Sequence, residues 1–166
     1  VPPKAPTKSD TAVFAAGCFW GVEKLFHETP GVLSTAVGYT GGHADKPTYK
    51  QVCTGKTGHA EAVEVVFDPT RVTFKELTRL FFEAHDPTTL NRQGPDHGTQ
   101  YRSAVFFRDA QQEKIAREVR DELVAKKTWT DPVVTEIVKS STFWKAEDYH
   151  QKWFLTHPVY CHRTKG

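Results

Sequence analysis

A cysteine flanked by aromatic residues and glycines is the most chemically suggestive feature of the sequence. Cys18 lies in the stretch Gly17-Cys18-Phe19-Trp20-Gly21, after a short apolar run and before apolar residues at helical spacing. This pattern predicts a strand-to-helix turn, and a helix N-terminus stabilises an anion through its free N–H groups and its dipole. We therefore predict a readily ionised, nucleophilic thiol, with Phe19 and Trp20 lining an apolar pocket. The alternative is that Cys18 is a small buried core residue, the usual fate of a free cysteine.

A carboxylate and two tyrosines could serve such a nucleophile as proton donors. Glu61 stands near the start of a predicted strand, within Gly58-His59-Ala60-Glu61-Ala62. If Glu61 faces a pocket, burial raises its pKa and makes it a proton donor near neutral pH. If it does not, it points to solvent like most glutamates. Tyr39 ends one predicted strand and Tyr101 begins another, so their hydroxyls either share one cleft or lie at its rim.

The loop from Asp86 to Thr99 contains two prolines, two glycines and many hydrogen-bonding side chains. Loops of this length inside a compact domain are often functional. Asp96 and His97 lie in this loop, just before Tyr101. The sequence leaves open whether Asp96 and His97 are turn residues, hydrogen-bond anchors or catalytic groups.

The other two cysteines differ in their setting. Cys161 lies in a tail, residues 156–166, that we expect to be irregular and mobile. It is either an incidental thiol or a resolving cysteine that can reach an oxidised Cys18. Cys53 has no special setting, and we predict a structural role for it. The cysteines show neither the Cys-x-x-Cys spacing of a zinc site nor the pattern of a secreted disulfide framework.

Strands and helices alternate along the chain and must position these residues. The predicted order is an extended arm at 1–10, a strand at 11–16, a helix at 22–28, strands at 32–39 and 61–67, a helix at 73–84, a strand at 101–107, a helix at 110–126, a strand at 133–138 and a partly helical aromatic segment at 143–154. The first six elements have the split βαββαβ order of ferredoxin-like folds, in which a layer of helices covers a sheet. We predict one α+β catalytic domain over residues 1–166, with additions on the C-terminal side of that core.

The composition argues against two classes of function. The net charge is only +2 and the basic residues are scattered, so nothing favours nucleic-acid binding. No apolar run is long enough to cross a membrane. The charged and hydrophobic fractions, 25% and 38%, are those of an ordinary globular domain.

Four separate segments of the chain are similar to the signature segments of one enzyme family, the A-type peptide methionine sulfoxide reductases. They are, in the family's order, Gly17-Cys18-Phe19-Trp20-Gly21, Gly38-Tyr39-Thr40-Gly41-Gly42, Thr57-Gly58-His59-Ala60-Glu61 and Asp96-His97-Gly98-Thr99-Gln100-Tyr101-Arg102-Ser103. The resemblance covers roughly residues 11–161, and several unlinked segments are more specific than one short pattern. It implies reduction of the S epimer of methionine sulfoxide, free or in proteins.

The resemblance implies a role for each candidate residue. Cys18 would attack the sulfoxide sulfur, while Phe19 and Trp20 would hold the methyl group of the substrate. Glu61 would protonate or hydrogen-bond the sulfoxide oxygen, because attack at sulfur is easier when the oxygen is becoming a hydroxyl. The other implied site residues are Tyr39 and Tyr101, through their hydroxyls, and Asp96, through supporting hydrogen bonds.

The resemblance also implies how the enzyme is regenerated. Cys18 would become a sulfenic acid, Cys161 would attack it to form a disulfide, and thioredoxin or another dithiol would reduce that disulfide. Some relatives carry two cysteines in the tail, whereas Cys161 is alone here, so we expect a single-resolver cycle with Cys53 as the weaker alternative. No cofactor or metal is implied. The need for a thiol reductant implies a reducing compartment, which is the cytoplasm, or an organelle if a leader has been removed. We expect the protein to be a monomer.

Without the family resemblance, the residues also fit two other functions. One is a thiol peroxidase that reduces hydroperoxides through Cys18, which would need neither an aromatic methyl pocket nor a neutral acid. The other is a non-catalytic module that binds peptides in an aromatic groove, for which the Cys18 thiol would be dispensable.

Overall fold

The computed structural model describes residues 9–157 of the chain. The predicted N-terminal arm, up to residue 8, lies outside the described residues. So do Cys161 and most of the predicted tail.

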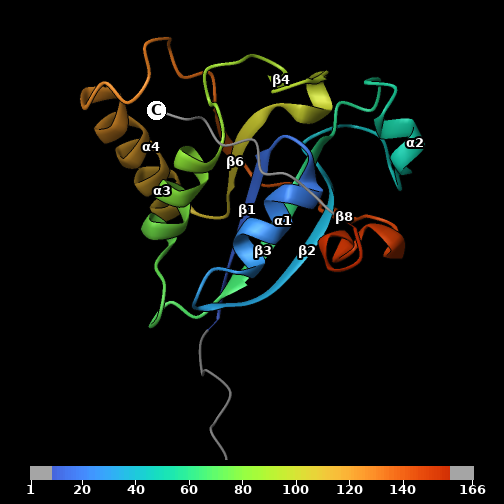
Figure 1. Ribbon diagram of the computed structural model, residues 1–166, viewed down its shortest axis with the longest axis horizontal. Helices are drawn as coiled ribbons and strands as arrows, with labels where there is room; N and C mark the ends of the chain where they lie inside the picture. Colours follow the sequence, from blue (N-terminus) through green and yellow to red (C-terminus); the bar gives the residue numbers. More distant parts are fainter. Residues whose placement is uncertain (1–8, 158–166) are drawn as a thin grey trace, which may run out of the picture.

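A six-stranded sheet with helices on one face makes up the described part of the chain (Figure 1). The strands of this sheet are β1 (Asp10–Ala16), β2 (Val32–Thr40), β3 (Ala60–Phe67), β6 (Ser103–Phe107), β7 (Glu136–Lys139) and β8 (Trp144–Lys145). A separate two-stranded sheet contains β4 (Arg92–Gln93) and β5 (Asp96–His97). The helices are α1 (Phe19–His27), α2 (Tyr49–Val52), α3 (Phe74–Ala84) and α4 (Ala110–Ala125), with 3₁₀ turns η1 (Thr99–Tyr101), η2 (Asp148–His150) and η3 (Trp153–Leu155).

The strand order confirms the predicted α+β class. Across the sheet the order is β7-β6-β1-β3-β2-β8, and the four central strands pair antiparallel throughout. Two interleaved βαβ units, β1-α1-β2 and β3-α3-β6, produce this order, which is the split βαββαβ arrangement. The C-terminal additions extend the sheet at opposite edges, with β7 parallel to β6 and β8 antiparallel to β2.

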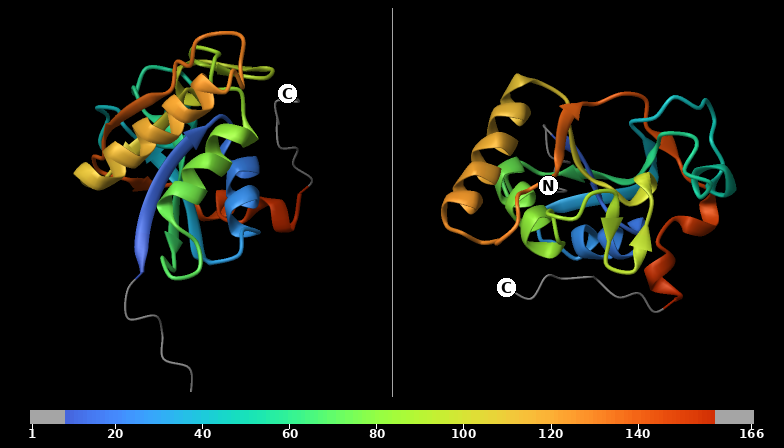
Figure 2. Two further views of the ribbon diagram at one scale, coloured as in Figure 1. Left: turned by 90° about the vertical axis from the view of Figure 1, so that its left-hand side faces the viewer. Right: turned by 90° about the horizontal axis from the view of Figure 1, so that it is seen from above.

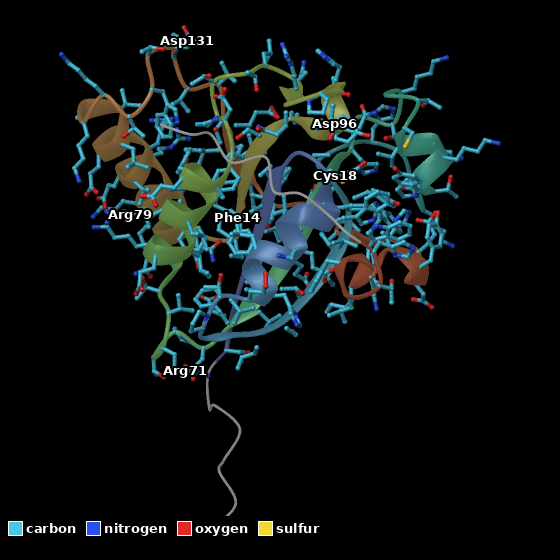
Figure 3. The ribbon with its side chains drawn as sticks, viewed as in Figure 1. Phe14, Cys18, Arg71, Arg79, Asp96 and Asp131 are labelled. Carbon is cyan, nitrogen blue, oxygen red and sulfur yellow. The ribbon has the colours of Figure 1, made fainter. Side chains whose placement is uncertain are left out.

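The main core lies between the sheet and the layer formed by α1, α3 and α4, which lie in a row along one face (Figure 2). Phe14 of β1 is fully buried near its centre (Figure 3). Its ring stacks on Phe26, Phe74 and Phe81 at centroid distances of 5.0, 6.0 and 5.2 Å. These contacts join α1 and α3 to the strand that leads into Cys18, so the core fixes the direction in which the Cys18 turn leaves the sheet.

Small side chains line the opposite face of the sheet. Ala15, Ala60, Ala62 and Ala104 form a second buried cluster with Val13 and Phe106, and Phe143 packs against it. Phe143 belongs to the connection between β7 and β8, which lie at opposite edges of the sheet. The short alanine side chains leave room for this chain crossing, which brings the C-terminal segment to the edge beside β2.

Several element boundaries differ from the predictions because polar loops contain ordered structure. The predicted loop before Lys50 ends in α2, and the predicted loop at 86–99 folds into the β4–β5 hairpin. The predicted strand at 101–107 begins only at Ser103, and the aromatic segment at 143–154 forms a short strand and 3₁₀ turns in place of a helix. The expected capping box of α3 is confirmed, with reciprocal bonds between Thr73 and Glu76.

Candidate active site

The turn between β1 and α1 carries Cys18 as the N-cap residue of the helix, as the sequence predicts. Gly17 precedes it with φ of +96°, and a Cβ at this position would lie 2.7 Å from the side chain of Gln93. A glycine is therefore needed both for the left-handed backbone and for the close approach of the β4–β5 hairpin. Figure 3 shows Cys18 at the start of α1, with Asp96 on the neighbouring hairpin.

The start of α1 offers N–H groups to two acidic groups. Backbone N–H groups of Trp20 and Gly21 hydrogen-bond with the Cys18 sulfur and favour its thiolate. The N–H of Phe19, the first residue of α1, donates to Glu61 Oε1 at 3.2 Å. The helix N-terminus therefore places the nucleophile and the carboxyl group side by side.

The acidity of Cys18 differs from the prediction. Burial, followed by the charge of Glu61, raises the pKa of Cys18 to about 12, although the two N–H groups act in the opposite direction. A helix N-terminus alone favours the thiolate, but desolvation and a neighbouring carboxylate both penalise a second negative charge. The prediction of a readily ionised free thiol is therefore wrong, and the thiol has to lose its proton during the reaction.

Glu61 has the environment of a proton donor. It lies on the helix-facing side of β3, is 1% exposed, and its Oε2 has no hydrogen-bond partner among residues 9–157. Burial raises the pKa of Glu61 to about 8, opposed by the Phe19 N–H and assisted by the charge of Asp96. Near neutral pH the group is mainly a neutral acid, with one buried oxygen that no side chain or backbone group of the described residues satisfies.

Tyr39 does not have the predicted role. It is directly opposite Glu61 in the β2–β3 register, but its side chain is fully buried. Its hydroxyl donates to Glu147 Oε1 at 2.8 Å, away from the carboxyl of Glu61. A buried hydroxyl that already has an acceptor cannot meet a substrate, so Tyr39 supports the site from within the core.

Tyr101 lies among the other candidates. Burial raises the pKa of Tyr101 above its ordinary value, and the charges of Glu61, Cys53, Asp96 and Cys18 add to the shift. These groups lie on β3, at the C-cap of α2, on β5 and at the N-cap of α1, respectively. The half-buried phenol at the end of η1 therefore stays protonated as a potential hydrogen-bond donor beside Glu61.

Sequence reasoning missed Tyr49, which the structure brings to the same place. Burial and then the charge of Glu61 raise the pKa of Tyr49, and its hydroxyl hydrogen-bonds with the thiol of Cys53. A sequence signal was present, because Thr48 and Gln51 have the spacing of a capping box, and the structure contains both of its bonds. This signal marks Tyr49 as the first residue of an ordered helix, in a stretch that otherwise looks like a loop.

Aromatic side chains form a wall of stacked and tilted rings that begins directly after Cys18. Phe19 is buried and Trp20 is half-buried, with ring centroids 6.3 Å apart. Tyr49, His150 and Trp153 complete the wall, with the Trp153 ring stacked on Trp20 at 4.4 Å and the His150 ring 4.3 Å from Tyr49. We call these five residues the aromatic cage. His150 and Trp153 had no distinguishing spacing in the sequence, so the fold alone reveals them.

Polar contacts hold the C-terminal part of the cage in place. Trp20 Nε1 donates to His150 Nδ1 at 2.9 Å. Buried Glu23 of α1 accepts both the backbone N–H and the Nζ of Lys152, each at 2.7 Å. The side-chain amide of Gln151 exchanges two hydrogen bonds with the backbone of Val37, each at 2.9 Å, and so extends the β2 edge.

The remaining candidates have distinct settings. Asp96 is half-buried in β5, and its charge raises the pKa of both Cys18 and Glu61. His97 is exposed beside it. Cys53 is an exposed free thiol next to Tyr49, and Cys161 lies outside the described residues.

Comparisons with known proteins decide the family. The family model described as peptide methionine sulfoxide reductase matches residues 10–166. The chain belongs to the peptide methionine sulfoxide reductase family.

Relatives and solved structures agree with this assignment. The chain is 55% identical to the peptide methionine sulfoxide reductase MsrA of Methanosarcina acetivorans, over 87% of this chain and 77% of that protein. Its fold is similar to methionine sulfoxide reductase A of Corynebacterium diphtheriae, with a TM-score of 0.83 at 43% identity over 95% of this chain and 81% of that one. It is also similar to reduced Mxr1 from Saccharomyces cerevisiae, with a TM-score of 0.87 at 36% identity over 96% and 92% of the two chains.

Two further findings concern only the described residues. Within residues 9–157, no group of three or more His, Cys, Asp or Glu side chains could hold a metal ion. In the same part of the chain, no helix is long and apolar enough to cross a membrane.

Proposed function

We propose that this member of the family reduces methionine-S-sulfoxide, free or in proteins, through the thiol of Cys18. The observation that carries the proposal is the free oxygen of Glu61. A buried, largely neutral acid with an unpaired oxygen lies beside a half-buried thiol, next to the aromatic cage. A thiol peroxidase would need neither the acid nor the wall.

The chemistry of the first step follows from the protonation states. Glu61 hydrogen-bonds the sulfoxide oxygen and gives it a proton as Cys18 attacks the sulfur. The thiol proton of Cys18 replaces the proton that Glu61 has given away. The bond that forms between the two sulfur atoms and the substrate's sulfur–oxygen bond then break as the hydroxyl passes to the Cys18 sulfur. In the net step, the sulfoxide gains two electrons and leaves as methionine, while Cys18 loses two electrons and becomes a sulfenic acid. Because the two protons needed are both present at neutral pH, the raised pKa of the free thiol does not prevent the reaction.

The phenol of Tyr101 adds a hydrogen bond to the oxygen, and that of Tyr49 adds another by giving up its bond to the Cys53 thiol, which is only a weak acceptor. Both hydroxyls are affected by the charge of Glu61, and both stay protonated. Donors held in place for a developing negative charge stabilise the transition state without reorganisation. Asp96 assists indirectly, because its charge helps to keep Glu61 protonated.

The aromatic cage provides the site for the methyl group of the substrate. Phe19 and Trp20 follow Cys18 directly, so an apolar group held against them places its sulfur near the thiol. A fixed methyl group and a fixed oxygen leave one face of the sulfur open to attack, which explains selection of one epimer.

We propose that Cys161 resolves the Cys18 sulfenic acid by forming a disulfide with loss of water, and that thioredoxin or another dithiol reduces this disulfide. The solved structures that share the fold of this chain include Mxr1 from Saccharomyces cerevisiae in complex with Trx2, with a TM-score of 0.65 at 23% identity. Cys53 is the alternative resolver, since its thiol lies exposed beside Tyr49. A thiol reductant is available in the cytoplasm, which we propose as the compartment for this single catalytic domain.

The test is turnover with a thioredoxin system on separated epimers. We expect reduction of the S epimer in an N-acetylated or peptide substrate, and loss of turnover in Cys18→Ser. Hydrogen peroxide, offered at the same concentration, should be consumed far more slowly. Faster consumption of peroxide than of the sulfoxide would reject the proposal in favour of a thiol peroxidase.

A further inference from the structure

The carboxylate of Glu147 connects segments that are far apart in the sequence. Glu147 immediately precedes η2, the turn that carries His150. One of its oxygens accepts the Tyr39 hydroxyl at 2.8 Å, and the other accepts the backbone N–H of Tyr49 at 3.0 Å. The two bonds tie the C-terminal segment to the end of β2 and to the first residue of α2.

Tyr49 depends on such an anchor, because α2 is only four residues long. A helix of one turn has no stability of its own. The capping box between Thr48 and Gln51 closes the start of this turn but does not attach it to the rest of the fold. Val52 buries the end of the turn in the core, and a charge-assisted hydrogen bond to Glu147 fixes the N–H of its first residue, Tyr49, whose phenol lies near Glu61.

We propose that Glu147 is a positioning residue, which sets the phenol of Tyr49 for its hydrogen bond to the sulfoxide oxygen. The inference rests on the proposed function. Glu147 does not touch the substrate in this account, and it acts through Tyr49. It requires a carboxylate, because only a carboxylate offers a full acceptor oxygen to each of the two donors.

The other wall of the site has separate anchors. The Trp20–His150 hydrogen bond and the Glu23–Lys152 ion pair hold the part of the cage around Trp20 and His150, and neither involves the Glu147 side chain. Loss of Glu147 should therefore disturb the oxygen end of the substrate more than its methyl end. The effect is expected mainly on the rate constant of the chemical step, with a smaller effect on the concentration of sulfoxide that gives half-saturation.

A double-mutant cycle between Glu147 and Tyr49 tests this inference. The oxidation of Cys18 by N-acetyl-methionine-S-sulfoxide is measured in a single turnover, without reductant, in four proteins: the wild type, Glu147→Gln, Tyr49→Phe and the double variant. We expect Glu147→Gln to lower the saturating rate constant about tenfold, since small displacements of a reacting group cost one to two orders of magnitude. In the Tyr49→Phe background, the same substitution should change the rate less than twofold.

Controls separate this effect from general damage. Asp148→Asn changes an exposed carboxylate in the same turn and should leave the rate constant unchanged. Tyr39→Phe removes one bond to Glu147 but leaves the Tyr49 tether, and it should lower the rate constant by about twofold at most. If Glu147→Gln unfolds, which circular dichroism will show, Glu147→Asp replaces it in the same cycle.

Each outcome decides the inference. The inference would be overturned if the two substitutions lowered the rate constant by factors that simply multiply in the double variant. It would also be overturned if Glu147→Gln changed only the sulfoxide concentration that gives half-saturation. Non-additive losses in the rate constant would support it. If the wild type itself does not oxidise Cys18 with the sulfoxide, the proposed function fails, and that result is distinct from additivity in an active enzyme.

Discussion

The substitution Glu61→Gln should change two reactions of Cys18 in opposite directions. Gln keeps the size and the hydrogen-bonding shape of the side chain but has neither a transferable proton nor a charge. Sulfoxide reduction needs the proton, whereas simple alkylation of the thiol is slowed by the charge. Because unfolding would also expose the thiol and speed its alkylation, circular dichroism of Glu61→Gln must match that of the wild type.

The size of the first effect follows from the pKa of Glu61. With a pKa of about 8, about nine in ten molecules carry the neutral acid at about pH 7, whereas an ordinary glutamate would carry it in about one in 300. Burial therefore raises the supply of acid about 300-fold. General acid catalysis contributes about 10² to 10⁴ in rate, so we expect Glu61→Gln to lower the single-turnover rate constant at least about 100-fold.

The second effect concerns the free thiol. The charge of Glu61 is, after burial, the largest contribution that raises the pKa of Cys18. Removing this charge lowers the pKa of Cys18 and increases the thiolate fraction, most clearly above about pH 8, where Glu61 of the wild type is ionised. Alkylation of Cys18 by iodoacetamide at about pH 9 should therefore be faster in Glu61→Gln than in the wild type.

The assay follows both reactions in the same samples. Mass spectrometry of the peptide that contains Cys18 separates its alkylation from that of exposed Cys53. Glu64→Gln is the matched control, because it makes the same change three residues along β3 at a side chain that does not face Cys18. If both reactions slow together in Glu61→Gln, or if alkylation does not accelerate, the assigned electrostatics of the site are wrong.

Three further predictions address pH and the core. The single-turnover rate constant for the sulfoxide should fall as pH rises through about 8, because the neutral form of Glu61 is lost there, and a rate constant that is flat to about pH 10 would contradict this. Burial lowers the pKa of His85 to about 4, so the unfolded chain binds the extra proton between that value and 6.5, and stability falls as pH falls through this window. Urea unfolding should show that the free energy of unfolding falls by about 2 kcal/mol on this account between about pH 7 and pH 5. The free energy of unfolding of His85→Gln should fall less over the same range. Phe14→Ala should lower the free energy of unfolding by about 4 kcal/mol, and a loss below about 1 kcal/mol would contradict its place at the centre of the core.

The sequence predicted those features of the site that local patterns determine. The strand-to-helix turn at Cys18 follows from an apolar run, two glycines and helical spacing, and the structure places the residue at the N-cap. Whether Glu61 faces a pocket or solvent stayed open in the sequence, and the structure places it on the helix-facing side of β3. Short-range patterns of this kind also gave the central strand order, because the split βαββαβ sequence of elements has few compact arrangements.

The features that were wrong or missing depend on contacts between distant segments. Tyr39 and Tyr49 cannot be distinguished by residue type, and the choice between them depends on Glu147, about a hundred residues further along the chain. The pKa of Cys18 depends on the depth of burial and on the ionisation of Glu61, neither of which a spacing reveals. His150 and Trp153 reach the cage only because the chain crosses the sheet between β7 and β8.

The central claim is that Cys18 takes the two oxidising equivalents of one methionine-S-sulfoxide. The most direct measurement is a single turnover of the reduced protein with racemic N-acetyl-methionine sulfoxide, without reductant, followed by chiral separation of the sulfoxides and mass mapping of the cysteines. We expect one equivalent of the S epimer to disappear, one equivalent of N-acetyl-methionine to form, and Cys18 to be oxidised in the same amount. Formation of N-acetyl-methionine with Cys18 still in its thiol form, or equal consumption of both epimers, would contradict the account.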